Sequence, residues 1–335
     1  MQSAVFTPDA MKTFLSRVLA MAIGLLVGVG LLALAFRGTD VGSVHTALAD
    51  GDWTLPGLGV LMGTAIFVAA KTARWRCLLG GAAGTSTADL VRATTAGLAL
   101  NALLPHTGEV VRAVSLHRRR GWVTSAVLAS IVAERVFDLF AVLLLAAVAL
   151  ACVPVPAAVA GAVRTLGVVA AVGAVLIVAV LAWPAPFRQL ARGLARPLPV
   201  RWVDPLLREV DAAINGLEPV RSGSTAARVL AWSLLQWLAI AGCVACSALV
   251  VGDAIGLGGS LLVVVGIVVA FLLPNAPGYA GSVQLAFVVS LAASGVPPAH
   301  AIAASVVYQL LMIFPVVVLG LAWLRGSLAP VTLDP

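Results

Sequence analysis

Apolar residues run in stretches of about 20 along most of the chain, separated by short basic or proline- and glycine-containing segments. A run of about 20 apolar residues can cross a bilayer as a helix, whereas a membrane β-strand would alternate over about 10 residues. The pattern therefore predicts an all-α polytopic membrane protein with about six full spans. The expected spans cover residues 16–36, 54–73, 123–152, 158–183, 227–251 and 299–324.

Two further apolar segments are interrupted before they cross the bilayer. The first opens with the capping box Ser86-Thr87-Ala88-Asp89, ends at Leu103-Leu104-Pro105 and leads into a short helix. The second covers residues 257–273, breaks at 274–281 and continues as a short helix over 282–294. Both patterns predict broken or re-entrant helical units. The residues that we expect to shape the two breaks are Pro105, Gly108, Pro274, Pro277, Gly278 and Gly281.

The two broken units resemble copies of one sequence. Each is followed by a span of similar texture, in which Glu134 aligns with Gln309 at an offset of 175 residues. Three full spans separate the units, so the second enters from the opposite face, as in the inverted repeats of secondary transporters. We predict a single integral membrane domain over 1–335, with a first repeat at about 54–183, a second at about 227–325, and a basic amphipathic segment, 184–226, between them. Because lipid cannot satisfy broken backbone, the two breaks predict a polar cavity.

Composition and charge agree with a membrane protein. The 335 residues are 61% hydrophobic and 10% charged, and the mean hydropathy is +1.08, whereas about a quarter of the residues of a soluble domain are charged. The net charge of +7 comes mainly from arginines in short loops, which argues against a nucleic-acid partner. We interpret Lys71, Arg74 and Arg76 as a cytoplasmic anchor and place Arg37 and Arg164 on the outer side. The expected location is the bacterial inner (cytoplasmic) membrane, with both termini inside.

No catalytic constellation is visible in the sequence. It lacks a Walker loop, a His-Glu-x-x-His motif and a Gly-x-Ser-x-Gly elbow. We expect no cofactor, no metal and no enzymatic activity, although sparse carboxylates and arginines can serve membrane enzymes. Cys243-x-x-Cys246 can be read as a redox or zinc pair, but it lies in mid-span without a histidine or another cysteine close in sequence.

Three ionisable residues, Glu134, Arg135 and Asp138, lie about a third of the way into the span 123–152. A charge at the centre of a membrane helix costs about 2.5–3.5 kcal/mol on insertion scales, so these groups should be paired and turned away from lipid. Arg135 points about 100° from Glu134, which makes Glu109 a candidate partner. Two readings remain open: an ion-pair network that fixes helix packing, and a polar site for a charged head group.

Polar residues of both broken units complete the candidate site. Arg112 suits a lipid phosphate because its guanidinium is a planar, bidentate donor. His106 lies in the first break and can titrate. The full set of expected substrate-binding residues is Glu109, Arg112, Glu134, Arg135, Asp138, Asn101, Asn275, Tyr279 and Gln309.

The motifs Gly108-Glu109 with Arg112, Glu134-Arg135 with Asp138, and Pro274 through Gly281 resemble the transmembrane domain of lysylphosphatidylglycerol synthases. Small flippase-like membrane proteins share that domain, and the resemblance covers about residues 15–325. It implies movement of an aminoacylated phosphatidylglycerol or a glycolipid between leaflets. No soluble transferase domain follows the last span, so we do not expect synthesis of the lipid.

The leading hypothesis is a lipid flippase-like transporter with its cavity between the broken units. The alternatives are a secondary transporter of a small hydrophilic solute and a membrane-embedded lipid-modifying transferase. The expected partner is a membrane phospholipid or glycolipid and not a nucleic acid. Self-association into a homo-oligomer and a separate lipid-synthesising enzyme are both left open.

Overall fold

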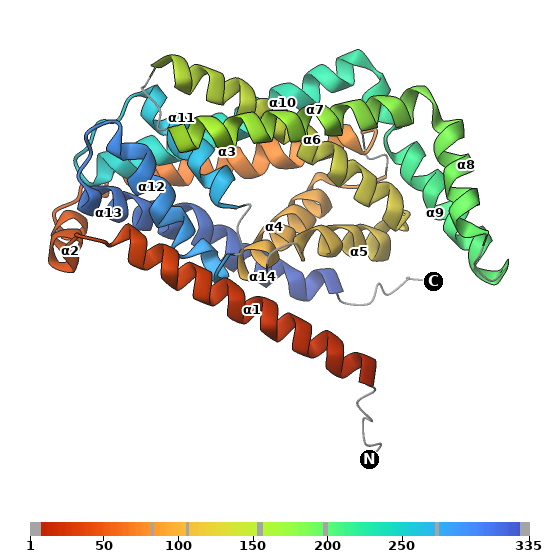
Figure 1. The fold of residues 1–335 in the computed structure, drawn as a ribbon, viewed down its shortest axis with the longest axis horizontal. Helices are drawn as coiled ribbons and strands as arrows, with labels where there is room; N and C mark the ends of the chain where they lie inside the picture. The colour runs from red at the N-terminus through yellow and green to blue at the C-terminus, as the bar shows by residue number, and fades with distance from the viewer. Residues whose placement is uncertain are drawn as a thin grey trace.

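A computed structural model describes residues 8–81, 84–104, 107–152, 157–196, 200–271 and 275–328. These residues form helices and connecting turns without a strand, which confirms the all-α prediction (Figure 1). Pro105, His106 and Pro274 lie outside the described residues. The elements in chain order are α1 (Pro8–Ala35), α2 (Val41–Ala49), α3 (Leu55–Leu78), α4 (Thr87–Leu103), α5 (Gly108–Arg120), α6 (Thr124–Cys152), α7 (Ala157–Ala182), α8 (Pro184–Ala195), α9 (Val200–Gly216), η1 (Glu218–Arg221), α10 (Gly223–Val250), α11 (Leu257–Ala270), η2 (Pro277–Tyr279), α12 (Ser282–Ala292), α13 (Pro298–Tyr308), η3 (Gln309–Ile313) and α14 (Phe314–Leu328).

Four helical stretches of the described chain are long and apolar enough to cross a membrane: α3, α6, α10 and the continuous run Pro298–Leu324. A fifth arises if the end of α7 and α8, which meet at 95°, count as one bent span. Shorter apolar helices include Ala22–Ala35 and α11. The protein is therefore a multi-pass membrane protein, and six full crossings remain a prediction.

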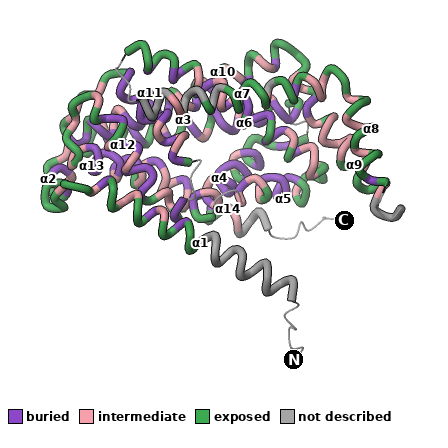
Figure 2. Tube along the Cα trace, in the orientation of Figure 1, coloured by how far each residue is buried: buried purple, intermediate pink, exposed green. Residues whose placement is uncertain are grey.

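Burial follows the expected division between a packed interior and a lipid-facing surface. Buried positions gather where α3, α10, α11, α12 and α13 lie together, whereas α8 is mostly exposed (Figure 2). Large apolar side chains of α7 point outward, among them Val168, Val172 and Val175. Exposed apolar surface on this scale is typical of helices that face lipid rather than water.

The closest helix pair in the interior, α3 and α10, depends on small residues. Gly59 and Gly63 of α3 face Cys246 and Cys243 of α10, and a Cβ on either glycine would overlap the cysteine sulfur. The Cys243 thiol also lies 3.4 Å from the carbonyl oxygen of Val60. Four-residue spacing of small residues lets membrane helices approach closely. The cysteine pair therefore has a packing role, which accounts for its spacing without redox or zinc chemistry.

Each broken unit folds back on itself, with α4 against α5 and α11 against α12. Each unit then packs on the span that follows the other unit: α4 contacts α14, and α11 contacts α6. The contact pattern is thus reciprocal between the two halves of the chain. This is the arrangement that a two-fold repeat would produce, although the proposed repeat boundaries remain a prediction.

Helix α1 packs on the second break through two glycines. A side chain at Gly24 would meet the backbone of Asn275, and one at Gly28 would meet Ala276. Gly281 in turn lies against the Gly28 carbonyl. Close backbone contact of this kind supplies neighbours for the irregular segment, as interrupted backbone at membrane depth requires.

The basic segment between the two halves forms two helices, α8 and α9. Both lie within the basic amphipathic segment expected over 184–226. Arg188 of α8 pairs with Asp211 of α9 at 2.5 Å, and Gly216 at the end of α9 lies against the backbone of Ala126 on α6. The second helix is therefore anchored to the bundle as well as amphipathic.

Candidate functional site

The first break is held by the side chain of Asn101, near the end of α4. The capping prediction for this helix is confirmed, because the Ser86 hydroxyl accepts from the backbone N–H of Asp89 at 3.1 Å. Asn101 Oδ1 accepts from the N–H of Gly108 at 2.7 Å, and its amide nitrogen donates to Glu109 at 3.2 Å. Gly108 is needed for close approach, since a Cβ there would overlap the Gly97 carbonyl. The second helix of the unit is thereby fixed against the first.

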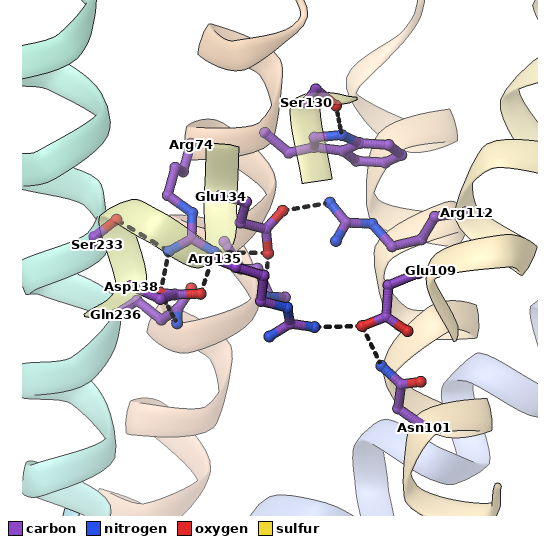
Figure 3. A network of polar contacts seen from close by, with 12 residues as sticks. Arg74, Asn101, Glu109, Arg112, Ser130, Glu134, Arg135, Asp138, Ser233 and Gln236 are labelled. Carbon is purple, nitrogen blue, oxygen red and sulfur yellow. Dashed lines mark hydrogen bonds and ion pairs between the residues drawn. The ribbon is translucent and has the colours of Figure 1, made fainter. Parts of the chain in front are cut away.

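Glu134 lies at the centre of a buried ion-pair network. Its carboxylate is fully buried and accepts from Lys71 Nζ at 2.5 Å, Arg74 Nη2 at 2.7 Å and Arg112 Nη2 at 2.8 Å. The two chain segments that supply these cations, α3 and α5, are thus tied to α6 (Figure 3). A buried carboxylate is tolerated only when it is paired and hydrogen-bonded, and Glu134 satisfies that condition with three cations.

Asp138, one helical turn after Glu134, joins α10 to the network. It forms an ion pair with Arg74 and accepts from Trp237 Nε1 at 2.9 Å and from Gln236 Nε2 at 3.3 Å. Arg74 also donates to Ser233 at 3.0 Å. The expectation that the acidic groups of this span are paired and turned away from lipid is therefore confirmed for both carboxylates.

Arg112 is held on two sides. Its guanidinium lies 4.0 Å from the centre of the Trp75 ring, in a cation–π contact, and pairs with Glu134. The Trp75 indole N–H donates to the Ser130 hydroxyl at 3.2 Å. Arg112 is only 3% exposed, so it braces the network and does not present an open surface to a phosphate.

Arg135 has the opposite character. Its side chain is 51% exposed, and it pairs with Glu109, the partner suggested by the sequence. Glu109 accepts from the side-chain amide of Asn101, and the backbone carbonyl of Asn101 accepts from the Tyr279 hydroxyl at 3.1 Å. A continuous chain of polar contacts therefore leads from the open edge of the charge network to the second break.

The second break uses left-handed backbone. Gly278, Tyr279 and Gly281 have φ values of 71°, 61° and 85°. A positive φ is rare for a side chain as large as tyrosine and is concentrated at functional sites. Gln309, which begins the π-helical turn η3, donates to the Gly278 carbonyl at 2.9 Å and accepts from Gln284. Gln284 in turn accepts from the N–H of Gly281 at 2.7 Å.

The 175-residue offset relates more than one pair of polar residues in the two halves of the chain. It pairs Glu134 with Gln309, and also Glu109 with Gln284. Two of the three carboxylates of the network, Glu109 and Glu134, thus correspond to carboxamides in the second half, whereas Asp138 corresponds to Ile313. Because two amides can bond directly, Gln284 and Gln309 contact each other, whereas Glu134 and Glu109 pair with separate arginines, Arg112 and Arg135.

The remaining expected site residues lie apart from the charges. Asn275 is buried, and its amide donates to the Ala270 carbonyl at 3.4 Å, inside the second break. Pro277 starts the turn η2. Gln309 belongs to the amide network rather than to the charged one. Within the described residues, no group of three His, Cys, Asp or Glu side chains is placed to hold a metal.

The interpretation of Lys71 and Arg74 as a cytoplasmic anchor was wrong. Helix α3 continues to Leu78, and both side chains are buried, with Arg74 at 0% exposure. The feature of the sequence that indicates their burial is their helical phase. The buried residues of α3 include Val60, Thr64, Phe67, Lys71, Arg74 and Leu78. These positions fall at intervals of three and four residues, whereas Arg76 lies off that stripe and is exposed.

Comparison with known families agrees with this architecture. The profile of the lysylphosphatidylglycerol synthase TM region matches residues 21–320, which is most of the chain. No curated protein sequence matches the chain.

Proposed function

Because the chain belongs to the lysylphosphatidylglycerol synthase transmembrane-region family, we propose that it moves a phospholipid or glycolipid between the leaflets of the bacterial inner membrane. The observation that carries the proposal is Arg135. Its half-exposed guanidinium lies within a membrane span, at the end of the polar chain that joins the two breaks. A half-exposed cation at that depth, even when it is paired with a carboxylate, is costly unless it faces an anionic ligand or an ion path.

The charge balance of the network favours an anionic head group. Four cations, Lys71, Arg74, Arg112 and Arg135, meet three carboxylates, Glu109, Glu134 and Asp138. When all seven are ionised, one positive charge is left over. A phosphate diester would neutralise it, and a guanidinium is a suitable donor to phosphate oxygens.

The network divides into a support and a contact edge. Arg74 and Arg112 are buried and both pair with the buried Glu134, so these three residues hold the geometry of the network. Arg135 and Glu109 form the exposed edge. In our proposal Arg135 meets the phosphate and Glu109 meets a hydroxyl or ammonium group of the same head group, which narrows the wider set of contacts expected from the sequence.

Exposed apolar side chains beside this edge favour a lipid over a hydrophilic solute. Leu103 and Leu104 at the first break and Val110 next to Glu109 are all exposed. A lipid presents a charged group and an apolar chain together, and this combination of surfaces suits both.

The test is translocation of fluorescent phosphatidylglycerol and phosphatidylethanolamine by the purified chain in proteoliposomes. Arg135→Gln should reduce the rate by roughly tenfold or more, the cost of one charged hydrogen bond. Arg192→Gln, an exposed arginine on α8, is the matched control and should transport normally. Normal transport by a folded Arg135→Gln protein would refute the site, and solute uptake without lipid movement would favour the solute carrier.

A further inference from the structure

A cavity lies at the arginine-rich end of the bundle, outside the charge network. It has a volume of about 720 Å³ and lies between the end of α3, the turn η1 and the start of α10. Arg76 donates to Thr87 at the start of α4. Arg120, at the end of α5, pairs with Asp89, which is also on α4. Several helix ends therefore meet at this end of the bundle.

Two arginines line the cavity without a carboxylate partner among the described residues. Arg76 donates to the Gly81 carbonyl at 3.2 Å and to Thr87 at 2.7 Å. Arg228 donates to the Ser224 carbonyl at 3.4 Å and to the Thr225 hydroxyl at 3.2 Å. These neutral contacts orient both guanidinium groups but neutralise neither. The arginines of the central network, by contrast, are paired with acids.

The same cavity receives the start of α10. Ser222 occupies the capping position, but its side chain does not cap the helix and contacts the Ser224 hydroxyl at 2.9 Å instead. The first backbone N–H groups of this 28-residue helix therefore lack a side-chain acceptor, and the positive end of its dipole faces the cavity. Uncapped helix starts are good sites for phosphate.

Two other residues that line the cavity narrow the chemistry of its ligand. Glu218 adds a carboxylate to the cavity wall, which disfavours a bare anion and suits a head group that also carries a hydroxyl or an ammonium. Trp232 lines the cavity two turns into α10, and tryptophan is enriched at the membrane–water interface.

We infer that this cavity binds the phosphate group of a lipid head group, with Arg76, Arg228 and the start of α10 as donors and Glu218 as acceptor for the head group's own donor. The site lies outside the central network and exists whether or not the protein translocates lipid. It would hold a lipid at the membrane face, either before entry to the bundle or as a bound structural lipid.

Cys77 provides a direct readout, because it lines the cavity and Cys152 does not. The purified full chain in dodecyl maltoside is treated with N-ethylmaleimide, and modification of each cysteine is followed by peptide mass spectrometry. Phosphatidylethanolamine should slow modification of Cys77 by about threefold or more through occupancy of the cavity. Digalactosyldiacylglycerol, which has no phosphate, should not, and Cys152 serves as the internal reference.

Further arms identify the source of the phosphate and the donors. Protection by inorganic phosphate alone would show that the cavity takes a free anion, which would overturn the lipid assignment. Arg228→Gln, and Arg76→Gln with Arg228→Gln, should abolish the protection by phosphatidylethanolamine, whereas Arg135→Gln should leave it intact. Equal protection by the two lipids, or protection that survives the double substitution in a folded protein, would overturn the inference.

Discussion

The two broken units solve the same physical problem with different chemistry. Each interrupts a helix at membrane depth and must satisfy the freed polar groups internally. The first unit does so with Asn101, whose side chain accepts from the N–H of Gly108, beside a network of ion pairs centred on Glu134 of α6. The second uses left-handed backbone at Gly278 and Gly281 and a bonded amide pair, Gln284 and Gln309. The first unit thus has surplus positive charge, which suits the binding of an anion. The second unit is neutral and suits holding the backbone in one conformation.

This difference predicts different costs of disruption. Removal of one partner from a buried ion pair leaves an uncompensated charge, whereas removal of an amide leaves only unsatisfied hydrogen bonds. Substitutions should therefore destabilise the first unit more than the second at buried positions, and least of all at the exposed edge.

The largest effect is expected for Glu134→Gln. Lys71, Arg74 and Arg112 would lose the carboxylate that they share, so the free energy of unfolding should fall by about 3–5 kcal/mol. Unfolding in mixed micelles, followed by circular dichroism, measures the change. A smaller loss than that of Gln309→Leu would show that the ion pairs contribute less to stability than the amide pair.

Gln309→Leu tests the neutral unit. It removes the donor to the Gly278 carbonyl and the acceptor for Gln284, so we expect a loss of about 1–3 kcal/mol in the same assay. Because Gln309 begins the π-helical turn, hydrogen exchange around residues 309–313 should also rise. If the loss matches that of Glu134→Gln, the contrast between the units is wrong.

Tyr279→Phe cuts the link between the two breaks. It removes one hydrogen bond, to the Asn101 carbonyl, and keeps the aromatic ring, which lies 4.3 Å from the Phe271 ring. The free energy of unfolding should fall by about 0.5–1.5 kcal/mol. If lipid transport also slows while the fold is retained, the link contributes to function; an unchanged rate would make it purely structural.

Arg135→Gln should have the smallest effect on stability and the largest on transport. Its pair with Glu109 is half exposed, and exposed ion pairs contribute about 0–1 kcal/mol. A stability loss as large as that of Glu134→Gln would place Arg135 with the buried support, contrary to its assignment as the contact edge.

Several features followed from sequence because they depend on local pattern. Long apolar runs predict helices, since only a helix satisfies its own backbone in lipid. The break after Leu103 and the cap at Ser86 also followed, because proline and capping residues mark the ends of helices locally. The pairing of Arg135 with Glu109 followed because Arg135 points about 100° from Glu134 and so needs a partner on another helix. For Lys71 and Arg74 the prediction was wrong, because it followed their nearness to a loop and not their helical phase.

The chain's pattern by itself therefore determined its class, its long apolar helices and the positions of its two breaks. Tertiary structure alone decided which charges are support and which are accessible. Glu134 and Arg135 are neighbours in sequence, yet one is fully buried among three cations and the other is half exposed. Adjacent residues on a helix point about 100° apart, so their surroundings depend on helices that are distant in sequence. Helix packing therefore separates the functions of two residues that a linear motif presents as one.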